Sequence, residues 1–292
     1  MVTNISAIKS DAGYRERQLI SQMVNSTFIF IFAYLLTYLG FQIITLGTAM
    51  IIGIKGYLYY NEIFFQPEAL WSVRSIILVT STGPLLALIT GIMILVYFSR
   101  NRKHLKPLTK LLLTWSGFHF INFFAGGIIS GTITGLGLGY ALDLILQRPI
   151  VIYFILDLMT LSLIIIFGYK SARLFLKSSP SNYWTQKDNQ KEYLFFSGLL
   201  PLFLGSLVIF LFKYPDHTPQ HDLILFHDMI LLVTIGCMII AMLFKKIKTN
   251  IHIKISRKER GRTINWNLFW VTIILLFLCR IILTRSFYSI FA

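Results

Sequence analysis

Seven apolar runs of 18 to 30 residues follow one another along the chain, with short polar segments between them. A helix crosses the hydrocarbon core of a membrane, roughly 30 Å thick, with about 20 apolar residues. The pattern therefore predicts an all-α, polytopic bundle of transmembrane helices with seven spans, or six if one run does not cross. The predicted spans are residues 27–54, 75–98, 111–140, 150–168, 194–212, 219–244 and 266–283.

The polar segments predict the domain organisation. Residues 1–26 are polar and mixed in charge, and we interpret them as a cytoplasmic N-terminal segment. Residues 27–292 then form one transmembrane helical domain, without an internal repeat or a soluble domain. Residues 55–72 are rich in Tyr, Phe and Trp, which favour the headgroup level of a membrane, so this stretch is predicted to be interfacial.

The composition excludes a water-soluble globule and places the chain in contact with the lipid bilayer. Hydrophobic residues make up 55% of the chain and charged residues 13%, whereas soluble domains have about 25% charged residues. The formal net charge of +15 is compatible with binding to nucleic acid. The basic residues, however, occur in short clusters between apolar runs, as in loops that face anionic lipid, so we predict no nucleic-acid partner.

The distribution of positive charge predicts the orientation. With the N-terminus inside, 21 of the 27 Lys and Arg residues fall in the inner segments, as the positive-inside rule requires. The bias toward Ile, Lys, Phe and Asn, together with the absence of a targeting signal, favours a multi-pass protein of the bacterial cytoplasmic (inner) membrane. Both cysteines lie inside apolar runs, so no disulfide framework is expected.

The third apolar run has a regular glycine pattern. Glycines recur every fourth residue, and on one helix they form a stripe at which a second helix can approach closely. We predict a packing seam here for a membrane-protein partner or for a second copy of the chain. As one helix, residues 111–142 measure about 48 Å, so this helix must overhang the membrane, tilt or break, and a break is expected first at Gly126-Gly127. The stripe, a glycine zipper, consists of Gly127, Gly131, Gly135 and Gly139.

The same run contains three polar residues: Ser116, His119 and Asn122. Ser116 and His119 share a helix face, but no acid or oxyanion element accompanies them. We therefore expect these side chains to form hydrogen bonds with neighbouring helices.

Acids and histidines gather toward the predicted outer side. Asp157 and Asp228 lie inside apolar runs, where a carboxylate is costly unless it is protonated, paired or bound to a cation. His221 and Asp228 are seven residues apart and share a helix face. The candidate metal ligands, for a zinc ion if any cofactor binds, are His217, His221, Asp222, His227, Asp228 and Asp157.

Three interpretations of these residues stay open. A zinc site with a bound water would make a membrane-embedded hydrolase with its site near the outer leaflet. A chain of carboxylates and imidazoles would relay protons or ions, as in a coupled transporter. In the third interpretation the two carboxylates pair with Lys, Arg or Asn on neighbouring helices and have a structural role only.

The first half of the chain contains, in this order, the stretches KGYLYYNEIFFQPEAL (55–70), STGPLLALITG (81–91) and FHFINFFAGGIISG (118–131). The order of these stretches resembles that in the site-2 protease family of intramembrane zinc proteases. The family's His-Glu-x-x-His motif is absent, because residues 26–54 contain neither His nor Glu. The resemblance therefore implies a non-catalytic relative, and no catalytic residue of the family is carried over.

No catalytic signature is complete in the sequence. We accordingly predict a non-enzymatic scaffold or partner-binding protein of the membrane, with the glycine stripe as its seam. The zinc-dependent hydrolase and the ion- or proton-coupled transporter are the alternatives.

Overall fold

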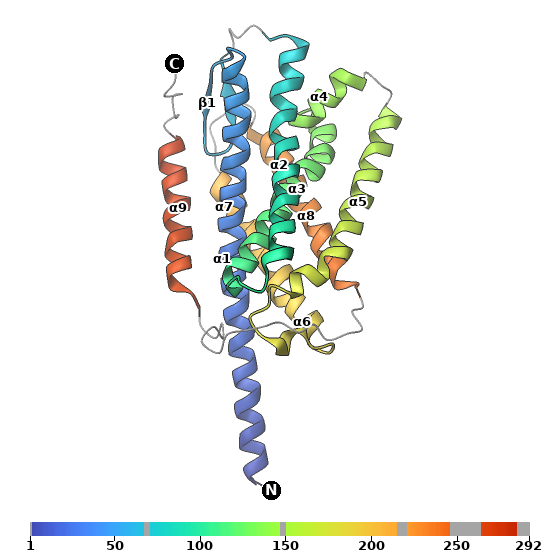
Figure 1. The fold of residues 1–292 in the computed structure, drawn as a ribbon. Helices are drawn as coiled ribbons and strands as arrows, with labels where there is room; N and C mark the ends of the chain where they lie inside the picture. The colour runs from blue at the N-terminus through green and yellow to red at the C-terminus, as the bar shows by residue number, and fades with distance from the viewer. Residues whose placement is uncertain (1, 67–70, 147–149, 215–220, 246–263, 285–292) are drawn as a thin grey trace.

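The computed structural model describes residues 2–66, 71–146, 150–214, 221–245 and 264–284, with side chains from residue 15 onward except that of residue 221. Seven of the described helices are long and apolar enough to cross a membrane, which confirms the predicted all-α, multi-pass bundle (Figure 1). They lie in α1 (Val2–Ile51), α2 (Val73–Asn101), α3 (Pro107–Thr134), α5 (Ile150–Leu176), α6 to α7 (Gln190–Lys213), α8 (His221–Leu243) and α9 (Trp266–Thr284).

The first helix is much longer than a membrane is thick. Its 50 residues span about 75 Å, and the N-terminal part projects beyond the rest of the bundle (Figure 1). The segment predicted as a polar lead-in thus continues the helix. It is tied to the bundle where Arg15 forms an ion pair with Glu192 of α6 (Gln190–Leu194).

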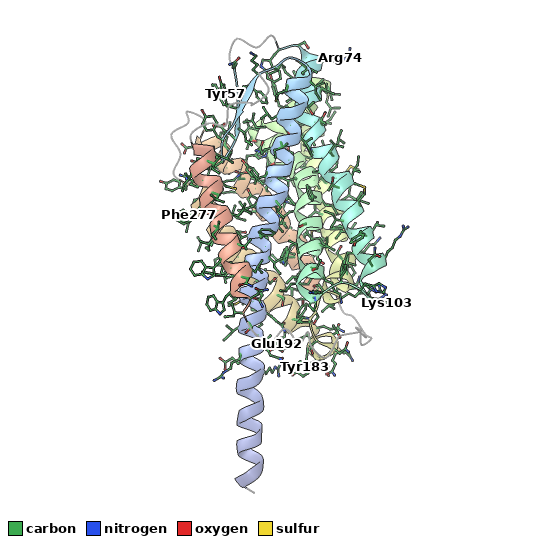
Figure 2. The ribbon with its side chains drawn as sticks, turned by 60° about the vertical axis from the view of Figure 1, so that its left-hand side comes forward. Tyr57, Arg74, Lys103, Tyr183, Glu192 and Phe277 are labelled. Carbon is green, nitrogen blue, oxygen red and sulfur yellow. The ribbon has the colours of Figure 1, made fainter. Side chains whose placement is uncertain are left out.

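The bundle has α3 at its centre. Of the most apolar 18-residue stretch of α3, 67% is buried, against 11% for α5 and 17% for α9. In Figure 1, α5 and α9 lie at opposite edges of the bundle, and Figure 2 shows Phe277 of α9 pointing away from it. The apolar faces of these outer helices therefore suit contact with lipid.

Two buried hydrogen bonds join the central helix α3 to α1 and to the turn before α7. A π-helical turn, η2 (Phe195–Leu199), connects α6 to α7 (Leu200–Lys213). The Ser26 hydroxyl of α1 donates to the Ser197 carbonyl of that turn at 2.5 Å and accepts from the Trp115 indole of α3 at 3.0 Å. These two bonds connect three elements that are far apart in the sequence.

The third helix breaks, but not where the sequence suggested. The helix continues through Gly126-Gly127 and ends at Gly135, whose φ of 70° is left-handed. Glycine is the residue best suited to that conformation. A short helix, α4 (Gly137–Leu146), then follows. The predicted site of the break, Gly126-Gly127, is wrong: the helix continues through it, and the left-handed cap at Gly135 ends the helix inside the predicted span 111–140.

The glycine stripe therefore does not form one continuous face. A Cβ atom at Gly131 would lie 2.4 Å from the Gly139 nitrogen, so these two glycines pack α3 against α4 of the same chain. Apart from the adjacent backbone of the same segment, no heavy atom of the described residues lies within 4 Å of a Cβ built at Gly127 or Gly135. Within the described structure, the closest packing at the stripe is an intrachain contact.

The aromatic segment after α1 folds into a β-hairpin, which the sequence did not predict. Strands β1 (Gly56–Leu58) and β2 (Ile63–Phe65) pair antiparallel, with Gly56 opposite Phe65. The hairpin lies at the end of the bundle opposite to the N-terminus (Figure 1). Following the predicted orientation, we refer to the hairpin end as outer and to the end with Lys103 and Glu192 (Figure 2) as inner.

Candidate intramembrane polar site

A buried ion pair lies between α7 and α8. Lys213 is the last residue of α7, and Asp228 is seven residues into α8, about 10 Å along it at helical rise. The Lys213 ammonium donates to Asp228 Oδ2, and the two residues are only 2% and 9% exposed. Because each ion is expensive to bury alone, the pairing is what makes both charges tolerable at this depth.

The ammonium of Lys213 also lies against two stacked tyrosines of α1, Tyr34 and Tyr38. The Lys213 Nζ lies 4.1 Å from the ring centroid of Tyr38 and 5.8 Å from that of Tyr34. The two rings stack with their centroids 5.7 Å apart. An ammonium within about 6 Å of an aromatic face gains cation–π attraction, which is larger in a desolvated setting. The lysine is therefore held by a carboxylate and by two rings.

The β-hairpin and α9 cover the outer side of this pair. Tyr60, in the hairpin loop, has its ring centroid 6.0 Å from that of Phe212, the residue before Lys213. The Arg280 guanidinium of α9 lies 3.8 Å from the Tyr60 ring centroid and donates to the Phe212 carbonyl at 2.7 Å. Arg280 thus contacts both the hairpin and the outer end of α7.

His227 contacts a different neighbour from the adjacent Asp228. Its Nε2 lies 3.2 Å from the Ser130 hydroxyl and its Nδ1 lies 3.0 Å from the Thr134 hydroxyl, both on α3. Both ring nitrogens therefore have a hydroxyl partner. Successive residues of α8 connect that helix to α3 through the imidazole and to α7 through the carboxylate.

Asp157 of α5 also contacts α3. The Thr132 hydroxyl lies 2.8 Å from each of its carboxylate oxygens. Thr132 lies between Ser130 and Thr134 in the sequence, but it contacts α5, whereas those two residues contact α8. The outer end of α3 thus has three hydroxyls that receive polar side chains from α5 and α8.

Asn122 makes the interhelical hydrogen bonds expected of it. Its Nδ2 donates to the Leu231 carbonyl at 2.8 Å, and its Oδ1 accepts from the Thr234 hydroxyl at 2.9 Å. Both partners are on α8, one to two turns inward from Asp228. The amide therefore continues the line of polar contacts between α3 and α8 toward the inner side.

His119 lies one turn further in and is enclosed by rings. Its ring centroid is 4.7 Å from that of Phe30 and 5.5 Å from that of Tyr34. The residue is 3% exposed, and its Nε2 has no hydrogen-bond partner among the described residues. Tyr34 therefore contacts the imidazole directly and lies near Lys213.

The predicted metal ligands do not assemble in the described part of the structure. No group of three or more His, Cys, Asp and Glu residues that could hold a metal occurs among the described residues. Asp228 is paired with Lys213, Asp157 with Thr132 and His227 with two hydroxyls, while Asp222 is exposed. His217 and the side chain of His221 lie outside the described residues.

Replacing Asn122 with alanine should lower the free energy of unfolding by about 1 kcal/mol, since interhelical hydrogen bonds in membranes are worth about 0.6–2 kcal/mol. Unfolding of the purified protein by increasing SDS in mixed micelles measures this change. Asn101→Ala is the control, because Asn101 is at a helix end and donates to the Tyr97 carbonyl of its own helix. Equal stability of the two variants would contradict the assigned role of Asn122.

Comparisons of the chain with protein families, with curated proteins and with solved structures find no significant match. The resemblance to site-2 proteases therefore stays a prediction. In the structure, Asn122 forms hydrogen bonds with Leu231 and Thr234 of α8, and Gly83 of the Gly-Pro stretch packs against Thr45 and Phe41 of α1.

Sequence reasoning identified Asp228 but missed Lys213 and the two tyrosines. Lys213 directly follows the last apolar residue of the fifth run, so the sequence pattern places it at the outer end of that span and not inside it. Its side chain is instead buried and paired with Asp228, whereas a lysine at a helix end normally reaches toward water. The signals were present in the spacing of Tyr34 and Tyr38, four apart on one helix face, and in a Lys that directly closes an apolar run.

Proposed function

We propose that this multi-pass membrane protein is an ion- or proton-coupled transport protein, and that the Lys213–Asp228 pair is its proton relay. The observation that supports the proposal is the burial of both charges between two membrane-spanning helices. Charged residues inside spans occur mainly where protons, ions or substrates pass. The predicted bacterial inner membrane, with the N-terminus inside, is part of the same proposal.

Proton binding at Asp228 changes the electrostatics of the whole site. A neutral carboxyl no longer balances the ammonium of Lys213, which then remains buried beside Tyr34 and Tyr38 without a counter-ion. An unpaired buried charge is strongly unfavourable. The site relaxes by losing the lysine proton or by moving α7 relative to α8. Either response links proton occupancy to a change in charge or in helix position.

The hairpin covers the outer side of the relay, and the polar contacts of α3 continue it inward. Arg280 and Tyr60 close the outer side, whereas Asn122 and His119 lie along α3 toward the inner side. A series of polar groups that continues from the ion pair toward the inner side suits a path across a membrane better than a single structural ion pair does.

The other two functions have less support from the geometry. The scaffold prediction rested on the glycine stripe as a packing seam for a partner or a second copy, but Gly131 and Gly139 pack against each other. The hydrolase prediction requires three ligands to converge, and among the described residues they do not. Both stay predictions.

Proton flux into proteoliposomes tests the proposal. We expect the wild-type protein, driven by a potassium diffusion potential, to acidify the vesicle interior faster than protein-free liposomes do, as reported by an entrapped pH dye. Asp228→Asn removes the titratable carboxyl and should reduce the rate to that of protein-free liposomes.

Asp222→Asn is the matched control, since this exposed acid is on the same helix, six residues away. It should conduct as the wild type does. Equal rates for wild-type and protein-free liposomes under potentials of both signs would overturn the relay. So would equal rates for the Asp228 and Asp222 variants.

A further inference from the structure

Asp157 of α5 is an intramembrane acid that the proposed relay does not use. The helix begins with Ile150 at the outer end of the bundle (Figure 1), and Asp157 lies about 10 Å along it from there. Two nearby apolar residues of α5, Phe154 and Leu158, are 68% and 55% exposed. Asp157 itself is partly exposed. The carboxyl group therefore lies inside an apolar span, beside a surface that suits contact with lipid.

No described cation neutralises this carboxyl group. Among the described residues, no Lys, Arg or His forms an ion pair with Asp157. Its polar contact is with the Thr132 hydroxyl of α3. A carboxylate at this depth is costly unless it is protonated, paired or bound to a cation. Asp228, by contrast, has the ammonium of Lys213.

The titratable groups on the neighbouring parts of α4 and α8 are engaged elsewhere. Asp143 of α4 is exposed and accepts from the Tyr153 hydroxyl at 2.7 Å. On α8, His227 contacts the two other hydroxyls of α3, Asp228 is in the buried ion pair and Asp222 is exposed. The state of Asp157 therefore depends on Thr132 and on the apolar surroundings.

The Thr132 hydroxyl has one hydrogen and three oxygen atoms within reach. The Ile129 carbonyl oxygen is 2.9 Å away, and each carboxyl oxygen of Asp157 is 2.8 Å away. A hydroxyl donates one hydrogen bond and accepts up to two, whereas an ionised carboxylate only accepts. With an ionised Asp157, one hydrogen would be shared among three acceptors. With a protonated Asp157, Thr132 donates to Ile129 and accepts from the acid, so both contacts are hydrogen bonds.

We propose that Asp157 is a second proton-binding site, occupied at neutral pH and accessible from the lipid-facing side of α5. The bound proton joins Asp157 to Thr132 without a net charge. Loss of that proton leaves an unpaired carboxylate beside lipid, which is unfavourable. The contact of α5 with α3 at this point therefore depends on a proton. The site is separate from the proposed relay, because its partner is a hydroxyl of α3 and not Lys213 of α7.

Dicyclohexylcarbodiimide, a hydrophobic carbodiimide, tests the site in the full-length protein in liposomes. The acid gives its proton to a carbodiimide nitrogen, and its oxygen adds to the central carbon to form an O-acylisourea. The acyl group then shifts to nitrogen and yields a stable N-acylurea, so no group leaves. We expect this adduct on the Asp157 peptide at neutral pH, detected by mass spectrometry. The reaction should slow as the pH rises, because the protonated fraction falls.

Two variants and a second reagent are the controls. Asp157→Asn should abolish the adduct, and the mapping on the wild type stands even if this variant does not fold. Asp143→Asn removes an exposed acid that is bonded to Tyr153 of the same helix, and it should leave the adduct unchanged. A water-soluble carbodiimide should modify Asp143 and leave Asp157 unmodified, because only Asp143 is at the exposed end of α4.

An adduct at Asp157 that forms only at acidic pH would overturn the proposal, because the carboxyl group would then be ionised at neutral pH. The absence of an adduct at every pH would also overturn it. So would equal reaction of Asp157 with the water-soluble reagent. The adduct is measured without proton flux, so this result and the result of the flux assay are independent of each other.

Discussion

Lys213→Met, with Asp228 retained, should lower the free energy of unfolding by about 3–5 kcal/mol, the usual cost of leaving one partner of a buried ion pair without the other. Methionine keeps much of the length and apolar stem of lysine, so lost packing contributes little. What remains is a carboxylate that is 9% exposed and has lost its only described ion-pair partner. SDS-induced unfolding of the purified protein in mixed micelles measures the effect.

The double variant Lys213→Met, Asp228→Leu separates the charge from the fold. Buried ion pairs replaced by apolar residues of similar size often leave stability unchanged or raise it by about 1–4 kcal/mol. We therefore expect the double variant to recover at least wild-type stability while its proton flux stays at the level of protein-free liposomes. A double variant as unstable as the single one would show that the cost of Lys213→Met comes from packing.

Recovered stability without flux has a consequence for the role of the pair. A pair that only fixed the arrangement of α7 and α8 would be dispensable once apolar residues fill its place. A relay is not dispensable, because no apolar residue binds a proton. The double variant thus distinguishes a structural ion pair from a functional one.

The spans were predictable because the membrane imposes a length and a polarity on each helix. Every described helix that can cross coincides with an apolar run, and α5, the most exposed, corresponds to the run 150–168. The hairpin after α1 was not predictable in this way. Its residues are aromatic and interfacial in composition, but they show no clear alternation, and its stability depends on contacts such as that of Tyr60 with Phe212.

The candidate site was predictable only in part, for the same physical reason. A carboxylate inside an apolar run, such as Asp228, stands out in a sequence because the bilayer makes it costly. Its partner did not stand out, because Lys213 is at a helix end, where a lysine normally reaches the headgroups. Which way such a chain turns depends on the tertiary structure, here on the two tyrosines of α1.

Gly139→Ala should destabilise the protein by about 2 kcal/mol or more, because overpacking a tight contact costs about 1–3 kcal/mol even where neighbours can shift. The added Cβ would lie 1.9 Å from the Gly131 carbonyl carbon and 2.2 Å from its oxygen. Those are backbone atoms, so no rotamer change relieves the clash, and α4 has to move away from α3. The same SDS titration measures the loss.

Gly127→Ala is the matched control from the same glycine series. It is in the interior of α3, and apart from the backbone of its own helix no heavy atom of the described residues lies within 4 Å of the added Cβ. Since alanine is favoured over glycine by about 0.5–1 kcal/mol inside a helix, this variant should be slightly more stable than the wild type. If instead Gly127→Ala were destabilising and Gly139→Ala neutral, the seam would lie along α3 toward another helix or a second copy. We expect the opposite result, in which Gly139→Ala lowers the stability and Gly127→Ala raises it slightly. That result would assign Gly131 and Gly139 to the packing of α3 against α4.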